Sequence, residues 1–251
     1  MGPTVPVRYL ETLWRSGVDL LFPKCCQNCG DPFRQGLSNV LCQNCWDSIR
    51  PYVGPFCSKC GASLPSGAFE GAVDIFCTDC TDGLCSLDGV RSLGPYRGAL
   101  RVAHHVFKFE GLENLAKTMA LKMVETIPRP GVDALVPVPM SQVKEREKGY
   151  NPVLALALAL GSLWGLPVQR TLGKVRSTPP QMSLGQTERL ANPKGAFSLT
   201  TGSPLLERVM LVDDVLTTGA TLEECAKVLK RSGTSWTGAV VWGRTPKDLL
   251  P

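Results

Sequence analysis

The sequence has no apolar run long enough to cross a lipid bilayer. Its longest apolar stretch, Val153 to Val168, is interrupted by Gly161, Ser162 and Gly165, and it falls short of the ~20 residues that a membrane-spanning helix needs. The first residues also lack a basic segment followed by an uninterrupted apolar core. We therefore expect no transmembrane segment, no secretory signal and a cytoplasmic protein.

Histidine is scarce and the net charge is small. The 251 residues include two histidines, and 27 Lys and Arg against 22 Asp and Glu leave a net charge of +5. With 43% apolar and 20% charged residues, the chain can form a core and is neither disordered nor fibrous. At roughly 100–200 residues per domain, its length suggests one large domain or two of moderate size. We interpret His104 and His105 as packing or surface residues rather than catalysts.

The positive charge is concentrated in one stretch. Between Met140 and Lys194 there are eight basic and three acidic residues, an excess that equals the net charge of the whole chain. A local field of this sign suits a phosphate-rich partner, either a nucleotide or a nucleic acid backbone. A solvated basic face is the alternative.

Cysteine is abundant, but in one region only. Ten of the eleven cysteines lie between Cys25 and Cys85, and eight of them form four Cys-x-x-Cys pairs. Two intervening residues let a tight turn direct both thiolates at one tetrahedral Zn²⁺ ion. The candidate ligands are Cys26, Cys29, Cys42, Cys45, Cys57, Cys60, Cys77 and Cys80.

Disulfides are the alternative use of these pairs. A disulfide framework needs an oxidising compartment, and the absence of an export signal favours zinc. Sequential pairing would place the first two pairs on one structural ion and the last two on a second, although the spacing also permits an interleaved arrangement. A segment this short and this rich in Gly, Pro and Ser would need the folding free energy that metal binding supplies.

The chain divides near residue 90. Residues 1–89 hold the cysteine-rich module, which resembles a double zinc ribbon, and an amphipathic helix predicted between Val7 and Phe22. Residues 90–251 alternate between strand and helix patterns, which predicts an α/β domain with a parallel sheet. The predicted strands are Ala134–Pro139, Val209–Val212 and Gly238–Trp242; the predicted helices begin at Asn151-Pro152 and Thr221. Ligands of such sheets bind at the carboxyl ends of the strands.

The strongest candidate site follows the strand Val209–Val212. Two adjacent acids, Asp213 and Asp214, precede a loop of small hydroxylated residues and glycine that leads into a helix. Backbone N–H groups of the loop and the helix N-terminus could enclose a phosphate. The two carboxylates would repel that phosphate unless they bind ribose hydroxyls or hold Mg²⁺ through water. A simple helix cap would not explain both acids and the whole loop.

This segment resembles the phosphoribosyl pyrophosphate motif of type I phosphoribosyltransferases. Further motifs are Val136-Pro-Val-Pro139, Glu147-Lys-Gly-Tyr-Asn151, Arg176-x-Thr178-x-x-Gln181, Arg189-x-x-Asn192 and Gly195-Ala-Phe197. Together with the cysteine-rich module, their order is similar to that of the ComF competence family, which includes ComFC and GntX, over nearly the full length. The resemblance implies a type I phosphoribosyltransferase-like parallel sheet with helices.

The resemblance also implies roles for individual residues. Asp213 and Asp214 would contact the ribose hydroxyls of phosphoribosyl pyrophosphate. Its 5′-phosphate would lie in the loop formed by Thr217, Thr218, Gly219, Ala220 and Thr221. The residues Val138, Pro139 and Met140 would begin a loop that faces the pyrophosphate.

Arg146 and Lys148 are candidates to neutralise that pyrophosphate, and the segment from Arg176 to Arg189 matches a loop that closes over related sites. Lys108 aligns with a lysine common in the family, without an assignable role. The family usually has Arg-Gly-Phe-Asn-Gln where this chain has Lys148-Gly-Tyr-Asn-Pro152, so the bidentate fork of an arginine is lost.

Three functions remain open at this stage. The first is a phosphoribosyltransferase that uses Mg²⁺, although no group of residues identifies an acceptor, so the residues support a sugar-phosphate site better than turnover. The second is a DNA-uptake protein that binds single-stranded DNA, with Trp46, Tyr52 and Phe56 as stacking residues and a competence helicase as a partner implied by the family. The third is a non-catalytic factor whose phosphoribosyl site serves as a sensor.

Overall fold

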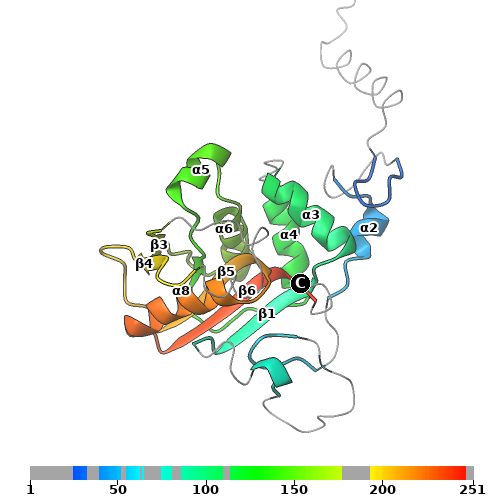
Figure 1. Cartoon of the computed structure of the whole chain (residues 1–251). Helices are drawn as coiled ribbons and strands as arrows, with labels where there is room; N and C mark the ends of the chain where they lie inside the picture. Colours follow the sequence, from blue (N-terminus) through cyan, green and yellow to red (C-terminus); the bar gives the residue numbers. More distant parts are fainter. Residues whose placement is uncertain are drawn as a thin grey trace, which may run out of the picture.

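The computed structural model describes the greater part of the chain (Figure 1). The described residues are 25–32, 40–51, 55–62, 64, 75–80, 86–109, 114–176 and 193–246. The predicted helix between Val7 and Phe22, the aromatic Tyr52 and most of the predicted closing loop, residues 177–189, lie outside them. Within the described residues, no helix is long and apolar enough to cross a membrane.

A four-stranded parallel sheet forms the centre of the molecule, which confirms the predicted α/β class. Its strands, in spatial order, are β1 (Gly89–Pro95), β6 (Trp236–Arg244), β5 (Arg208–Leu216) and β2 (Ala134–Pro137). A separate antiparallel pair consists of β3 (Leu172–Lys174) and β4 (Phe197–Leu199). Because all four central strands run in one direction, their carboxyl ends meet at one edge of the sheet.

Helices connect these strands. They are α2 (Gln43–Asp47), η1 (Thr78–Cys80), α3 (Gly98–Phe109), α4 (Leu115–Val124), α5 (Gln142–Lys148), α6 (Pro152–Trp164) and α8 (Ala220–Arg231). The start of α6 is as predicted: the Asn151 side chain accepts a hydrogen bond from Leu154 N, and Pro152 occupies the first turn. The helices α3, α4 and α5 and the strands β1, β3 and β4 were not predicted.

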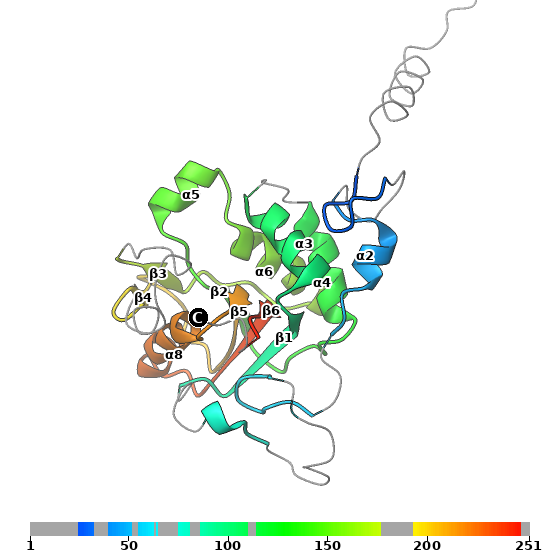
Figure 2. The ribbon, with the colours of Figure 1, turned by 45° about the vertical axis from the view of Figure 1, so that its right-hand side comes forward.

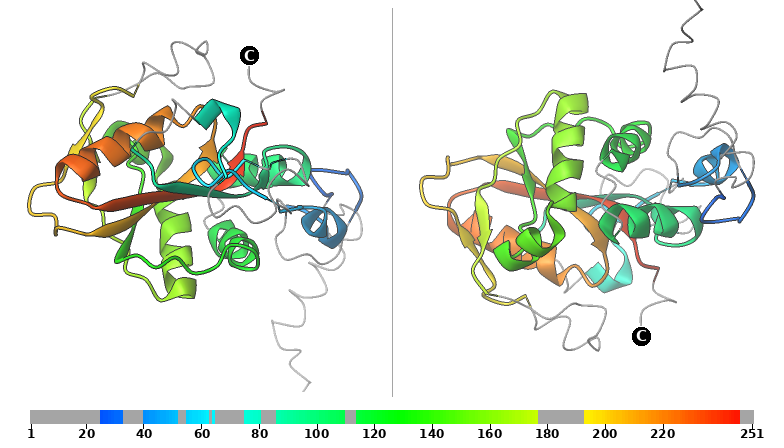
Figure 3. Two further views of the ribbon diagram at one scale, coloured as in Figure 1. Left: turned by 90° about the horizontal axis from the view of Figure 1, so that it is seen from below. Right: turned by 90° about the horizontal axis from the view of Figure 1, so that it is seen from above.

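Side chains of β5 alternate between the two faces of the sheet. Val209 and Leu211 belong to a core on the α8 side, whereas Met210 and Val212 belong to a core with α3, α4 and α6. Figure 3 shows this layering, with α8 (orange) on one side of the sheet and the green helices α4 and α6 on the other. A strand buried on both faces explains the continuous apolar sequence.

The first half of the cysteine-rich module packs beside α3. Its residue Trp46 on α2 is 3% exposed and stacks on Trp242 of β6, with ring centroids 6.1 Å apart. The indole N–H of Trp242 donates to the Leu100 carbonyl of α3 at 2.9 Å. The expectation that Trp46 is an exposed base-stacking residue is therefore wrong, because this ring fills the apolar core between α2 and the sheet.

The second half of the module packs on the other face of the sheet, beside the edge strand β1. Cys57, Cys60 and Cys80 belong to the α8-side core, and the Arg244 guanidinium donates to the Cys60 carbonyl at 2.7 Å. Figure 2 shows the two halves apart, α2 beside α3 and the teal helix η1 beyond β1. The cysteine-rich halves thus contact the β1 edge from both faces, while a domain boundary at residue 90 stays a prediction.

Two equivalent glycines provide a test of this docking. Gly30 and Gly61 each follow a Cys-x-x-Cys pair with φ of +80° and +68°, but a Cβ at Gly61 would lie 2.3 Å from the Val90 carbonyl oxygen, whereas one at Gly30 would meet nothing within 4 Å. We expect Gly61→Ala to lower the free energy of unfolding by about 2–4 kcal/mol and Gly30→Ala by about 1 kcal/mol. Urea unfolding of both variants measures the difference, and equal losses would contradict the docking.

Candidate functional site

Asp213 and Asp214 follow the four buried apolar residues of β5 toward the carboxyl edge of the sheet, and strand alternation separates them. Asp214 faces α3, where it contacts Lys108 and lies 3.2 Å from Nε2 of His104. Asp213 lies on the other face, near enough to the buried Cys225 of α8 for its charge to raise the pKa of that thiol in addition to the effect of burial. The adjacent acids therefore have different surroundings.

The surroundings give the two carboxyl groups opposite pKa shifts. Burial and the charge of Asp214 raise the pKa of Asp213 to about 8. Burial alone would also raise the pKa of Asp214, but the positive charge of Lys108 and the contact with His104 outweigh it and hold that pKa well below its usual value. Asp214 therefore stays ionised, whereas Asp213 keeps its proton to a higher pH than an isolated aspartic acid does.

A cavity of about 510 Å³ opens above these acids. It is lined by the start of α8, by the residues after β2, by α3 and by α5. Its basic residues are Lys108, Lys144, Lys148 and Lys174. Its acidic residues are Asp213, Asp214 and Glu147, so positive side chains surround the two central acids.

Burial and the charges of neighbouring lysines lower the pKa of two of these residues. Burial, followed by the charge of Lys108, lowers the pKa of Lys148. Burial, followed by the charge of Lys144, lowers the pKa of Lys174. An anion in the cavity would relieve both repulsions.

Most of the residues singled out in the sequence line this cavity. They are Val138, Pro139, Met140, Lys148, Asp213, Asp214, Thr217, Gly219 and Thr221. Thr218 and Ala220 belong to the same loop without lining it, and Arg146 is exposed on α5. Lys108, for which no role was predicted, also lines the cavity. His104, interpreted as packing or surface, is buried against Asp214, whereas His105 is exposed.

The lysine predicted at the pyrophosphate loop also ties α5 to α3. Lys148 Nζ donates to the Lys108 carbonyl at 2.7 Å and lies 4.7 Å above the ring of Phe109. Nearby, the Tyr150 hydroxyl donates to the Phe107 carbonyl. These contacts satisfy carbonyls of the last turn of α3, so the two helices that flank the cavity are fixed to one another.

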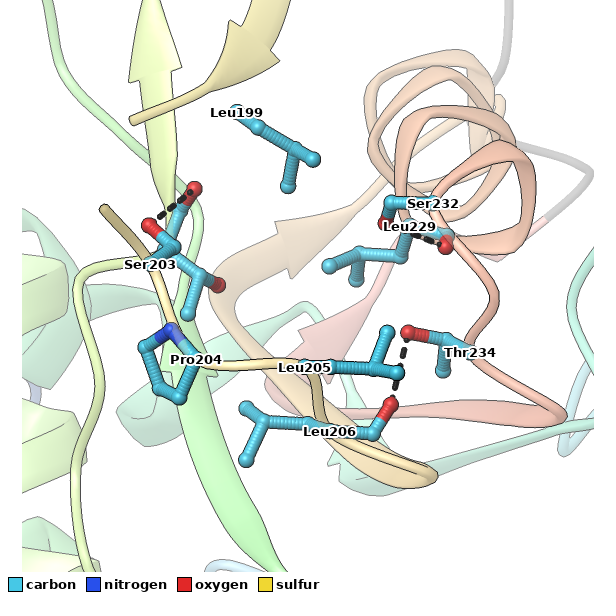
Figure 4. Close-up of a pocket in the computed structure, with 9 residues that line it drawn as sticks. Leu199, Ser203, Pro204, Leu205, Leu206, Leu229, Ser232 and Thr234 are labelled. Atoms are coloured by element: carbon cyan, nitrogen blue, oxygen red, sulfur yellow. Dashed lines mark hydrogen bonds between the residues drawn. The ribbon is translucent and has the colours of Figure 1, made fainter. Parts of the chain in front are cut away.

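A second, smaller hollow lies at the other end of α8 (Figure 4). Its volume is about 210 Å³, and its lining of leucine, proline, serine and threonine includes no charged side chain. Three of its hydroxyl groups bond to main-chain carbonyls, among them Thr234 to Leu206 at 2.9 Å and Ser232 to Leu229 at 2.7 Å. The charged cavity is therefore the better candidate for an ionic ligand.

The eight paired cysteines form two tetrads in sequential order, Cys26, Cys29, Cys42 and Cys45, then Cys57, Cys60, Cys77 and Cys80. Within each tetrad all four sulfur atoms lie within 4.8 Å of one another. The Sγ atoms of Cys29 and Cys42 are 3.8 Å apart and those of Cys60 and Cys77 are 3.7 Å apart. A tetrahedral zinc ion with Zn–S bonds of about 2.3 Å requires about 3.8 Å, whereas a disulfide requires about 2.05 Å.

Main-chain and amide N–H groups support the thiolates. The N–H groups of Cys60 and Cys77 point at Cys57 Sγ from 3.5 and 3.3 Å, and Asn28 Nδ2 donates to Cys45 Sγ at 3.2 Å. Against the effect of burial, such main-chain donors lower the pKa of Cys57 to about 6. The tetrads therefore fit Zn²⁺ in distance and donor type.

Comparison with known proteins assigns the chain to a family. It is 30% identical over 217 residues to Competence protein F of Haemophilus influenzae, covering 82% of this chain and 90% of the relative. The chain belongs to the competence protein F family. The family also includes DNA utilization protein YhgH of Salmonella typhi, 30% identical with 77% and 85% covered, and Competence protein ComFC of Bacillus subtilis, 27% identical with 77% and 79% covered.

The comparisons also characterise the two parts of this competence-family chain. Residues 17–84 match the family model of the double zinc ribbon domain, and both cysteine tetrads lie within this range. The similar solved structures include glutamine phosphoribosylpyrophosphate amidotransferase from B. subtilis, at 18% identity and a TM-score of 0.34, covering 57% of this chain and 26% of that one. Orotate phosphoribosyltransferase from Aeropyrum pernix is 21% identical with a TM-score of 0.30, and the match covers 53% of this chain and 57% of that one.

The raised pKa of Asp213 predicts a pH-dependent gain from Asp213→Asn. A carboxyl group whose pKa is higher in the folded than in the unfolded chain contributes stability at low pH, which is lost as the pH rises from about 4 to about 8. Without ligand or divalent cations, we expect the gain in unfolding free energy of Asp213→Asn to grow by about 1–3 kcal/mol between pH 5 and pH 8. Asp214→Asn, which strands Lys108, destabilises at both values; thermal unfolding measures each, and a gain independent of pH would contradict the assignment.

The tetrads predict two zinc ions per chain. Cys29→Ser and Cys77→Ser each remove one ligand from a different tetrad, so we expect each variant to retain one ion. Cys25→Ser is the matched control, because Cys25 neighbours a ligand and belongs to neither tetrad. Metal analysis of the purified proteins gives the counts; a single ion in the wild type would contradict two independent sites.

Proposed function

We propose that this competence-family protein binds phosphoribosyl pyrophosphate with Mg²⁺ in the cavity at the carboxyl end of β5. The observation that carries the proposal is the meeting of an acid pair, a Thr-Thr-Gly-x-Thr loop and four lysines in one cavity of about 510 Å³. The cavity has the volume of a small-molecule site and lies where ligands of parallel sheets bind.

Each part of the ligand has a matching group. The carboxylates of Asp213 and Asp214 accept the hydrogen bonds that the ribose hydroxyls donate. The loop 217–221 leads into α8, whose first N–H groups lack intrahelical acceptors and therefore suit the 5′-phosphate. The lysines that line the cavity neutralise the diphosphate, and bound Mg²⁺ would supply further charge neutralisation there.

Three of the eight basic residues between Met140 and Lys194 belong to this site. Lys144, Lys148 and Lys174 line the cavity, and Arg170 lies 3.5 Å from Glu145. This placement favours a compact phosphate ligand over a separate DNA-binding face made by the same residues. We therefore assign ligand binding to the cavity and leave transfer to an acceptor as a further step of the proposal.

The cellular role that we propose is DNA uptake or the use of external DNA. It rests on family membership, since the relatives are named for competence and for DNA utilization. Single-stranded DNA and a helicase of the same process are the proposed partners. We propose a cytoplasmic location, because a reducing compartment keeps zinc-binding cysteines from forming disulfides.

Calorimetric titration of phosphoribosyl pyrophosphate in excess Mg²⁺ tests the proposal. We expect binding by the wild type and at least a hundredfold loss in Asp213→Asn/Asp214→Asn, which replaces both charged acceptors of the ribose hydroxyls with neutral amides. Asp47→Asn is the matched control, because Asp47 is exposed on α2 outside the cavity. It should bind as the wild type does.

A folded, zinc-loaded wild type that binds no phosphoribosyl pyrophosphate would overturn the proposed ligand. Binding that survives in the double variant would instead move the ligand away from β5. Retained zinc and an unchanged circular dichroism spectrum show that the double variant is folded.

A further inference from the structure

Asp214 already has three partners within the protein. Lys108 Nζ contacts its Oδ2, and His104 Nε2 lies 3.2 Å from the same oxygen. The other oxygen, Oδ1, accepts the N–H of Val215 at 2.7 Å. A ribose hydroxyl or a hydrated cation that binds Oδ2 from the cavity therefore competes with Lys108 for this oxygen.

We propose that Lys108 is an exchangeable counter-ion of the acid pair. It holds Asp214 in the protein without ligand, and it leaves this carboxylate for the diphosphate when phosphoribosyl pyrophosphate and Mg²⁺ bind. The inference rests on the proposed function and adds a residue that touches the ligand.

The two side chains from α3 differ in their freedom to move. Lys108 lines the cavity, its side chain is 31% exposed, and its ammonium ends a flexible chain of four carbons. His104 lies one turn earlier on the same helix face, and its side chain is 5% exposed. Lys108 can therefore swing into the cavity while His104 stays in place.

A second contact fixes the histidine ring. The oxygen of Tyr96 lies 2.7 Å from His104 Nδ1, and the two rings meet edge to face with centroids 5.3 Å apart. Burial and the charge of Asp214 raise the pKa of Tyr96, so its hydroxyl stays protonated and can donate a hydrogen bond to Nδ1. The remaining ring proton is then on Nε2, which lies 3.2 Å from Asp214 Oδ2, so a small shift of the carboxylate lets His104 hold it after Lys108 leaves.

The charge of Lys108 should oppose the binding of a cation and favour the binding of a diphosphate. A buried carboxylate needs a nearby positive charge to stay ionised, and a divalent cation can take the place of Lys108. Removing Lys108 should therefore strengthen the binding of a cation alone. It should weaken the binding of a diphosphate ligand, which loses one of four lysines.

The experiment compares the zinc-loaded wild type with Lys108→Gln and with Lys144→Gln as a matched control. Mn²⁺ alone is titrated by electron paramagnetic resonance, and phosphoribosyl pyrophosphate is titrated by calorimetry at saturating Mg²⁺. For Lys108→Gln we expect Mn²⁺ affinity to rise about tenfold and phosphoribosyl pyrophosphate affinity to fall about tenfold. Lys144→Gln, whose lysine has no carboxylate of the pair to release, should lower only the second affinity.

The double variant His104→Ala/Lys108→Gln tests the positioning role. If His104 orients Asp214 for the incoming cation, the double variant loses the gain in Mn²⁺ affinity that Lys108→Gln shows. A double variant that keeps the whole gain would remove His104 from the proposal.

An unchanged or weaker Mn²⁺ affinity in Lys108→Gln would show Lys108 to be a fixed structural partner and would overturn the exchange. A wild type that binds no phosphoribosyl pyrophosphate overturns the proposed function instead. The Mn²⁺ titrations still decide the exchange in that case, since a tenfold gain in Lys108→Gln upholds competition for Asp214 and no gain refutes it.

Discussion

Side-chain alternation along β5 is the constraint on which the site depends. Because successive residues of a strand face opposite sides of the sheet, Asp213 and Asp214 cannot share the same neighbours. Asp214 meets the cations of α3, and Asp213 faces the side covered by α8. Two chemically identical side chains therefore differ in charge, and the pair can combine one permanent anion with one group that titrates near pH 8.

The cysteine-rich module belongs to the same physical system. The tetrad that contains Cys26 and Cys45 lies in the core that includes α3, and Trp46 extends this core to Trp242 and Leu100. The helix that carries His104 and Lys108 is thus packed between the first tetrad and the sheet. The module is too small to form a core of its own, and its buried residues instead belong to the core of the sheet. Its packing also supports the edge strand β1 and the helix α3.

The sequence predicted the features whose chemistry is local and missed those formed across the fold. Cys-x-x-Cys spacing and a strand, loop and helix in succession are local, so the tetrads and the acid loop could be found. Lys108 is 106 positions from Asp214, and only the packing of α3 beside β5 brings them together. On α5, Lys144 and Lys148 are four residues apart and share the face toward the cavity, whereas Arg146, between them, faces solvent.

The choice of lysine over arginine around the cavity has a physical consequence. An arginine beside Asp214 would hold the carboxylate through two parallel hydrogen bonds in a rigid plane. The ammonium of Lys108 is instead a compact charge that can donate a hydrogen bond to any nearby oxygen. Moving it from a carboxylate to a phosphate oxygen exchanges one charged acceptor for another with little geometric cost. The same reasoning applies to Lys148, whose ammonium also lines the cavity. Its single bond to the Lys108 carbonyl fixes the end of α3 without committing a rigid fork to the backbone, and its ammonium still lines the cavity, where it can meet a phosphate oxygen.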